Sequence, residues 1–293
     1  MSGLGFGFRV GHWTDADSIT GCTVVLPPLG NVTSCDVRGS SPGSRELESL
    51  HPDKRLTEVH GILLTGGSAF GLAAADGVMD WLAERDVGYR TKVATIPIVP
   101  AAVIFDLGSG SSNVRPGPAE GRAACEVASE EIATGVVGVG TGATVGKWAG
   151  MGFLAPGGIG LGRATSGGWS VSALAVVNSV GDVVGSDGSV LAGTSNPDPE
   201  YLPPALPDAQ IAANTVLAVV ATDATLDKRD VHWLAGRGSD GITVSVRPAH
   251  TRYDGDVVFT VATGASETAG TDLDLLGYLA TLAVASAVRD AVS

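Results

Sequence analysis

Positive charge is scarce in this chain of 293 residues, which has 18 Lys and Arg against 31 Asp and Glu and a formal net charge of −13 at pH 7. Phosphate backbones and anionic membranes attract clustered basic residues, so this composition argues against nucleic acid and membrane surfaces as partners.

Long apolar runs are also missing. No stretch of 18 apolar residues lacks a polar interruption, and residues 273–288 therefore predict a core helix rather than a membrane span.

Cysteine is rare, and its spacing excludes a common type of metal site. Cys22, Cys35 and Cys125 are odd in number and lack the C-x-x-C spacing of zinc and redox sites, so we expect buried thiols. The histidines form no H-x-H or H-x-x-x-H pair, and no G-x-S-x-G elbow is present. We therefore expect neither a metal nor another cofactor, and keep only His12 as a candidate pocket residue.

Charged residues of both signs make up 17% of the chain, whereas hydrophobic residues make up 44%. This ratio is typical of a folded protein with a large core rather than of a disordered one. The first residues, MSGLGFGFRVGHWTD, lack the basic start and apolar core of a signal peptide. We therefore expect a cytoplasmic protein.

The first two thirds of the chain alternate between strand and helix patterns. GCTVVLPP and NVTSCDVRG predict antiparallel strands, and HGILLTGG predicts another strand. SAFGLAAADGVMDWLAERD then has a helical period, with Ser68 as the expected N-cap. A second helix is predicted in GRAACEVASEEIATG, and GWSVSALAVVNSVGDVVG predicts two strands joined near residues 180–182.

The C-terminal part continues this alternation. TVLAVVAT predicts a strand, LDKRDVHWLAGR a helix, and ITVSVRP and DVVFTVAT two more strands. A last helix begins near Thr271 and Asp274, which have the spacing of a capping box. Such separate strand and helix runs predict layers of α and β elements.

A glycine-rich run, GVGTGA at residues 138–143, fits the nucleotide-binding pattern G-x-G-x-x-A. However, it follows a helical stretch, and no acidic residue lies about twenty positions further on. The Walker pattern also fails, because Trp148 follows Lys147 where Ser or Thr is needed. These glycines therefore predict close backbone packing or a pocket wall rather than a nucleotide site.

The pair Asn214-Thr215 lies between two contrasting segments. Residues 196–210, NPDPEYLPPALPDAQ, predict an exposed connector, whereas Thr215 begins a predicted core strand. A cut before Thr215 would leave a rigid strand that presents a new α-amine beside its own hydroxyl. Such an amine has a pKa of about 7.7 to 8.0 and can act as the base for that hydroxyl. The alternative is simply a loop-ending Asn followed by a strand-starting Thr.

The chain can make this cut itself. The Thr215 hydroxyl lies close to the carbonyl group of Asn214, and its attack would give an ester that water can open. Asn also tolerates strained backbone angles, which helps at such a position.

Four further polar residues are candidates for the same site. Asp254 and Asp256 flank a glycine at the start of a predicted strand, where alternation points both carboxylates to one face and can raise one pKa. Lys147 can lower the pKa of a hydroxyl or balance the aspartates, and the Asn178 amide can donate to an oxyanion. Taken singly, each also fits a structural alternative: an Asp-Gly turn, a solvated lysine and a strand-end turn.

Several ordered segments resemble one known family: HGILLTGGSAFGLAAADGVMDWL, PIVPAAVIFDL, GATVGKWAGM, SVSALAVVNSVGD and NTVLAVVATDATL. They are similar to self-processing aminopeptidases and amidases that include L-aminopeptidase/D-esterase, the β-aminopeptidases and nylon-oligomer (6-aminohexanoate oligomer) hydrolase. The resemblance implies an α+β fold, a four-layer αββα sandwich with N-terminal-nucleophile chemistry. It also implies one domain, residues 1–293, cut into residues 1–214 and 215–293, with four processed units in a homotetramer.

The resemblance also implies roles for the candidate residues. Thr215 is the expected nucleophile, as in the threonine-using branch of the family, and its freed amine is the base. Asp254 and Asp256 orient the site, Lys147 supports activation and Asn178 serves the oxyanion. The expected reaction is hydrolysis of small peptides or amides.

Two other functions remain open from the sequence. One is acyl transfer to an amine acceptor, as in the ornithine acetyltransferases, and the other is an unprocessed, non-catalytic assembly protein.

Overall fold

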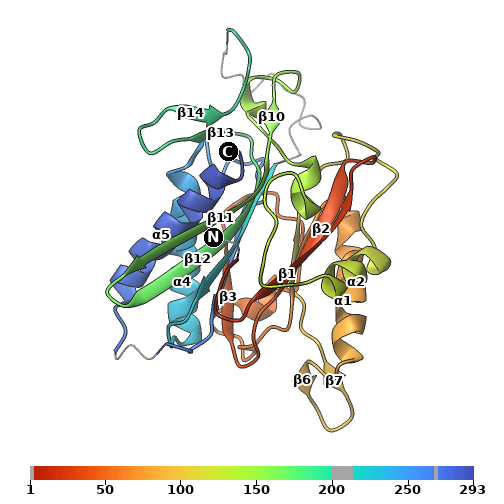
Figure 1. Ribbon diagram of the computed structural model, residues 1–293, viewed down its shortest axis with the longest axis vertical. Helices are drawn as coiled ribbons and strands as arrows, with labels where there is room; N and C mark the ends of the chain where they lie inside the picture. Colours follow the sequence, from red (N-terminus) through yellow and green to blue (C-terminus); the bar gives the residue numbers. More distant parts are fainter. Residues whose placement is uncertain (1–2, 199–213, 267–269) are drawn as a thin grey trace.

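Two five-stranded β-sheets form the centre of the computed structural model, which describes residues 3–198, 214–266 and 270–293 (Figure 1). The first sheet contains, in spatial order, β1 (Arg9–Asp15), β2 (Thr20–Leu26), β5 (Ile62–Thr65), β8 (Ala101–Val103) and β4 (Ser44–Arg45). The second contains β11 (Gly158–Ser166), β12 (Trp169–Asn178), β15 (Thr215–Thr222), β17 (Val257–Ala262) and β3 (Val32–Val37).

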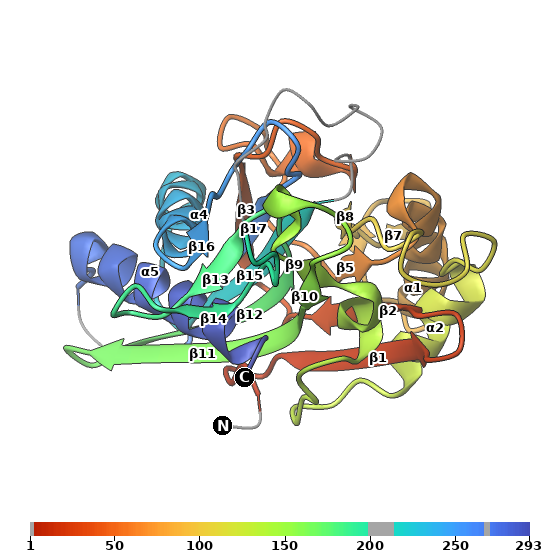
Figure 2. The same ribbon diagram turned by 90° about the horizontal axis from the view of Figure 1, so that it is seen from above.

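Helices cover the outer face of each sheet, so the layers run helix, sheet, sheet, helix (Figure 2). The helices are α1 (Ala74–Ala83) and α2 (Pro118–Glu126) on the first sheet, and α4 (Lys228–Thr243) and α5 (Leu273–Asp290) on the second. Leu64 of the first sheet packs with Leu174 and Phe259 of the second in the buried layer between the sheets. The expected four-layer αββα sandwich is confirmed.

Short elements complete the described part of the chain. Three small sheets are formed by β6 (Tyr89–Arg90) with β7 (Thr95–Ile96), β9 (Thr144–Val145) with β10 (Ala155–Pro156), and β13 (Asp182–Val184) with β14 (Val190–Ala192) and β16 (Val246–Arg247). Short 3-10 helices span Leu47–Leu50, Ser68–Ala73, Gly138–Gly142 and Lys147–Ala149.

The central strand of the second sheet is β15, which pairs antiparallel with β12 and parallel with β17. All eight of its residues are buried, as expected for a strand with neighbours on both sides and packing on both faces. The sequence prediction that Thr215 begins this strand is confirmed. One end of β15 therefore places Thr215 between β12 and the segment that leads into β17.

Several details differ from the sequence predictions. Ser68 is not a helix N-cap: it has a positive φ of 54° and opens a 3-10 helix that precedes α1. The last helix is capped by Asp272, whose carboxylate accepts from the Leu275 N–H at 3.0 Å, rather than by a Thr271 capping box. The strand predicted in ITVSVRP is only β16, because α4 continues to Thr243.

Other predictions are confirmed in part or in full. The second predicted helix ends at Glu126, before the acidic run that follows it, whereas residues 273–288 do form a core helix, α5. All three cysteines are buried free thiols. The connector predicted at residues 196–210 lies largely outside the described residues. Within the described ranges, no helix combines the length and the apolarity that a bilayer crossing requires.

Candidate active site

Thr215 is buried, with 5% of its surface exposed, at the point where three segments meet. In the sheet register it faces Asn178, the last residue of β12. On its other side, Asn214 forms a parallel bridge with Asp254, just before β17. The Thr215 hydroxyl donates to the carbonyl oxygen of Asn214. The nucleophile predicted from the sequence thus touches the peptide bond that it is expected to cut.

Lys147 and Asn178 form a buried pair beside this strand end. The Lys147 ammonium donates to the side-chain oxygen of Asn178 at 2.8 Å and to its backbone carbonyl oxygen at 3.1 Å. The same side-chain oxygen accepts from the Thr144 backbone N–H at 3.0 Å. Two donors on one oxygen fix the orientation of the amide, so the Asn178 NH₂ group points the other way.

Burial lowers the pKa of Lys147 to about 7, against the opposing effect of the Asp254 charge. Burial disfavours the charged form of an amine, because the ammonium loses its hydration. Lys147 can therefore exchange a proton near neutral pH, which an exposed lysine cannot do. The sequence alone did not predict this burial or the lowered pKa of Lys147, since a lysine after a glycine loop is usually solvated.

Asp254 is held by a short turn. Its carboxylate accepts from the Thr251 hydroxyl at 2.6 Å and the Thr251 N–H at 2.9 Å, and from the Val180 N–H at 3.3 Å. Burial, followed by repulsion from Asp256, raises the pKa of Asp254 to about 6. The structure thus agrees with the sequence-based expectation that two close acids would raise one pKa.

Unlike Asp254, Asp256 forms a hydrogen bond with the strand that carries Thr215. Its carboxylate accepts from the Val216 N–H at 2.6 Å and hydrogen-bonds the His250 Nδ1 at 2.7 Å. The other ring nitrogen of His250 lies 3.2 Å from the Ser239 carbonyl oxygen. Because a carboxylate and a carbonyl oxygen both accept hydrogen bonds, the protonated ring, which carries hydrogen on both nitrogens, satisfies both contacts, so this environment favours the cation of His250.

His250 is the residue of this site that the sequence analysis missed. Burial lowers its pKa, but the hydrogen bond and negative charge of Asp256 outweigh that effect, so the pKa of His250 lies above its usual value. The available signal was its position, four residues before Asp254 in HTRYDGD. His250 has neither metal-ligand spacing to another histidine nor a hydrolase motif around it, so no histidine pattern of the sequence points to it.

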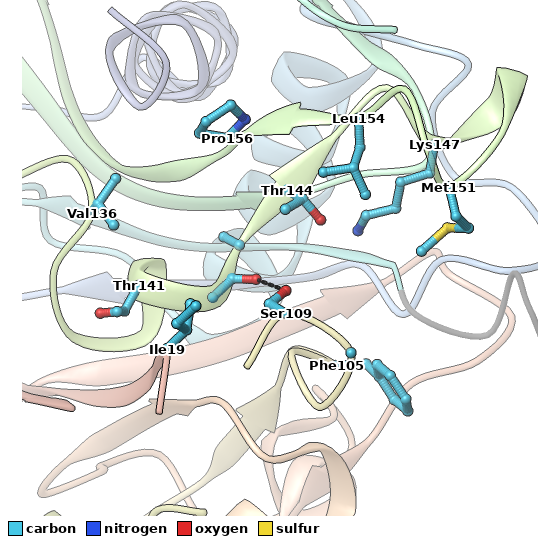
Figure 3. Close-up of a pocket in the computed structure, with 13 residues that line it drawn as sticks. Ile19, Phe105, Ser109, Val136, Thr141, Thr144, Lys147, Met151, Leu154 and Pro156 are labelled. Carbon is cyan, nitrogen blue, oxygen red and sulfur yellow. Dashed lines mark hydrogen bonds between the residues drawn. The ribbon is translucent and has the colours of Figure 1, made fainter. Parts of the chain in front are cut away.

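A cavity of about 590 Å³ lies next to Lys147, which extends into it beside Thr144 (Figure 3). Its walls are mostly apolar, and Lys147 is the one charged side chain among the described residues that line it. The lining residues come from five segments of the chain: Ile19; Phe105, Gly108 and Ser109; Val136; Thr141, Gly142, Ala143, Thr144 and Lys147; and Met151, Leu154 and Pro156. Such a cavity can hold an uncharged chain with its reactive group toward Lys147.

The glycine-rich run forms part of this wall, as predicted. Gly142 and Ala143 line the cavity, and the Gly142 carbonyl oxygen accepts from the Ser109 hydroxyl at 2.9 Å (Figure 3). His12 is not among the lining residues; its Nδ1 lies 2.9 Å from the Thr23 hydroxyl on the first sheet. This cavity therefore does not meet the expectation that His12 is a pocket residue, because the His12 ring faces Thr23 and lies against Gly138 instead.

Comparisons with known sequences give a consistent result. The model of peptidase family S58 matches residues 6–293. An uncharacterized aminopeptidase of Mycobacterium tuberculosis is 42% identical over 283 residues, which cover 88% of this chain and 80% of that protein. A 6-aminohexanoate-oligomer endohydrolase of Paenarthrobacter ureafaciens is 30% identical over 271 residues, which cover 88% of this chain and 73% of that protein.

Solved structures show the same fold. L-aminopeptidase D-Ala-esterase/amidase from Ochrobactrum anthropi, described as a variant of the Ntn hydrolase fold, matches with a TM-score of 0.72 and 18% identity over 99% of this chain and 86% of that chain. A β-aminopeptidase from Burkholderia sp. matches with a TM-score of 0.70 and 22% identity over 97% and 84%. The fold of this chain is therefore that variant of the Ntn hydrolase fold, as the sequence resemblance implied.

Proposed function

The chain belongs to peptidase family S58 and is a hydrolase of the aminopeptidase or amidase type, and we propose that its nucleophile is Thr215, freed when the chain cuts itself after Asn214. One observation carries this proposal: the Thr215 hydroxyl, at the start of the central strand, contacts the carbonyl group of the bond to be cut. Two subunits, residues 1–214 and 215–293, would result.

Before the cut, Thr215 has no free amine, so another group must take the proton of its hydroxyl. Lys147 is suited to this role, because burial brings its pKa to about 7 and leaves much of it neutral at that pH. After the cut, the α-amine of Thr215 is a base attached to the nucleophile itself.

In turnover, the Thr215 hydroxyl attacks the amide carbonyl of a substrate, expels an amine and forms an acyl-threonine ester. Water then hydrolyses this ester. Asn178 is positioned to donate its NH₂ group to the developing oxyanion, since its oxygen is already turned toward Lys147. Asp256 holds the Val216 N–H and so fixes the strand behind the nucleophile.

The family and the cavity support a proposal for the substrate class. Related proteins carry the names aminopeptidase and 6-aminohexanoate-oligomer endohydrolase, so we propose small peptides or oligoamides as substrates. The mostly apolar cavity beside Lys147 suits an aliphatic or aromatic part of such a molecule. A panel of chromogenic aminoacyl anilides that differ only in the acyl side chain measures this preference.

Intact-mass analysis of purified protein tests the proposal. Wild-type protein should yield two fragments that end at Asn214 and begin at Thr215, and Thr215→Ala should remain one chain without amidase activity. Thr215→Ser should still cut, because serine supplies the same hydroxyl.

Thr222→Ala is the matched control, since Thr222 is a buried threonine at the other end of β15 that donates to the Ser170 carbonyl oxygen at 3.1 Å. It should cut like wild type. Full amidase activity in a Thr215→Ala chain would refute the proposed nucleophile.

A further inference from the structure

We propose that the backbone N–H of Gly255 is the oxyanion donor for self-cleavage between Asn214 and Thr215, an inference that rests on the function proposed above. The Gly255 N–H donates to the carbonyl oxygen of Asn214 at 3.0 Å. The Thr215 hydroxyl contacts the same carbonyl group. Nucleophile and oxyanion donor therefore already meet at one reacting group in the uncut chain.

The sheet fixes this donor. β15 pairs with β17 in a parallel register that matches Leu217 with Val257, and the bridge between Asn214 and Asp254 continues the same register three residues earlier. In a parallel ladder, the N–H after one bridge residue donates to the carbonyl of its partner. The Gly255 hydrogen bond is therefore the last rung of the ladder, and its position does not depend on a mobile side chain.

Two carboxylates hold the segment on either side of Gly255. Asp254 is bound by Thr251, and Asp256 binds the Val216 N–H at 2.6 Å, one residue beyond the nucleophile. The pair of acids thus aligns two chain segments against each other. This gives the acidic pair a positioning role in self-cleavage and gives the glycine between them the direct contact.

Glycine is required at position 255 by close approach. A Cβ atom placed there would lie 2.9 Å from the Thr215 hydroxyl oxygen and 2.7 Å from the Ser41 carbonyl oxygen. Any side chain would therefore press on the nucleophile or force the segment away from Asn214. Only glycine lets the backbone N–H reach the reacting carbonyl while the hydroxyl stays in place.

The cleavage step balances as follows. The Thr215 oxygen bonds to the carbonyl carbon of Asn214, its proton passes to neutral Lys147, and the carbonyl π electrons move to the oxygen that Gly255 faces. When this oxyanion collapses, the bond to the Thr215 nitrogen breaks and that nitrogen takes the proton from Lys147. Water then opens the ester, which leaves a carboxylic acid on Asn214 and restores the hydroxyl of Thr215.

Replacing the Gly255 amide by an ester removes only the N–H. In vitro translation with glycolic acid at codon 255 gives this chain, and electrophoresis follows its self-cleavage with time. Loss of one oxyanion donor typically costs about 10²–10³ in rate, and we expect a slowing of that order. Self-cleavage within threefold of the wild-type rate would overturn the proposal, whereas an uncut wild-type chain would instead count against the proposed function.

Glycolic acid at codon 188 is the matched control, because the Gly188 N–H donates to the Gly185 carbonyl oxygen at 3.1 Å in an exposed turn. That chain should cut at the wild-type rate. Resistance to trypsin equal to that of Thr215→Ala shows that an ester chain has folded.

A second measurement needs no backbone change. In the uncut Thr215→Ala chain, a ¹⁵N label on Gly255 and a ¹³C label on the Asn214 carbonyl should show an NMR scalar coupling across their hydrogen bond. Absence of this coupling, in a sample that does show couplings across the neighbouring β15–β17 hydrogen bonds, would overturn the proposal, even if the ester chain failed to fold.

Discussion

Lys147 and Lys228 are both buried lysines that donate to backbone carbonyl groups, but only Lys147 lies beside the strand end that carries Thr215. Burial lowers the pKa of both. Because an amine accepts a proton only in its neutral form, self-cleavage should accelerate as the pH rises through about 7, the pKa of Lys147. In Lys147→Met we expect this rise to disappear and the rate to fall by about 10²–10⁴-fold.

The measurement is the rate of fragment formation after translation, from pH 5.5 to pH 9. Lys228→Met serves as the control, since Lys228 is a comparable buried amine at the start of α4, which follows the end of β15 opposite to Thr215, and this variant should keep the wild-type pH midpoint. If the self-cleavage rate of Lys147→Met rose with pH at the same midpoint as that of the wild-type chain, Lys147 would be ruled out as the base.

His250 gives a second residue-level prediction, on stability. Its folded pKa lies above the unfolded value, so the pair with Asp256 stabilises fully below the unfolded pKa and loses this effect as the pH rises through the folded pKa. His250→Gln should therefore lower the free energy of unfolding at pH 5.5 by about 1.5–3 kcal/mol, the range for hydrogen bonds to charged groups, and by less at pH 9.

Urea denaturation of uncut Thr215→Ala chains at the two pH values tests this. His51→Gln is a suitable control, because His51 forms a similar pair with Asp53 at an exposed position, where solvent screens the charges, and this substitution should leave the free energy of unfolding nearly unchanged at both pH values. An equal loss at both pH values in His250→Gln would contradict the assigned charge.

At the level of elements, the strands and helices that carry the site were predictable where periodicity was strong. β15 and α5 follow directly from TVLAVVAT and the apolar run at residues 273–288. α4 extends through Ile242 and Thr243, whose β-branched side chains favour strand in isolation, because packing on the second sheet overrides that local preference.

The sequence predicted most residues of the candidate site, but it did not predict how their side chains contact one another. Lys147 and Asn178 come from different elements, and their contact depends on how the loop around β9 folds over the end of β12. His250 belongs to no recognised histidine motif, and its hydrogen bond to Asp256 depends on the path of the irregular turn between them, which residue patterns do not predict. Gly255 carries no side chain, so only the strand register reveals its contact with Asn214.

The packing of α5 on β11 gives an element-level prediction. A Cβ atom at Gly160 would lie 2.1 Å from the Ala287 carbonyl oxygen, so helix and strand touch through bare backbone. Gly160→Ala should lower the free energy of unfolding by about 1–3 kcal/mol, the usual cost of overpacking, or more. Gly152→Ala is the control, since no atom lies within 4 Å of a Cβ there. If the two variants had the same urea midpoint, α5 would be able to shift away from β11 without a loss of stability, and the prediction would be wrong.

At the level of the whole molecule, the resemblance leads us to propose an assembly of four processed units. Light scattering after gel filtration should then give about four times the 29.4 kDa chain mass. A mass equal to one chain would contradict this proposal and leave the other predictions unaffected, because they concern contacts within one chain.

The two halves of the proposed cut chain interleave within the second sheet. β11, β12 and β3 precede the cut and β15 and β17 follow it, in the spatial order β11-β12-β15-β17-β3. Cutting after Asn214 breaks none of the ladder hydrogen bonds within β15, and it leaves α4 and α5 packed on strands of both fragments. The fragments should therefore elute together on gel filtration in native buffer and separate only in urea. Separate elution of wild-type fragments in native buffer would show that the cut opens the sheet.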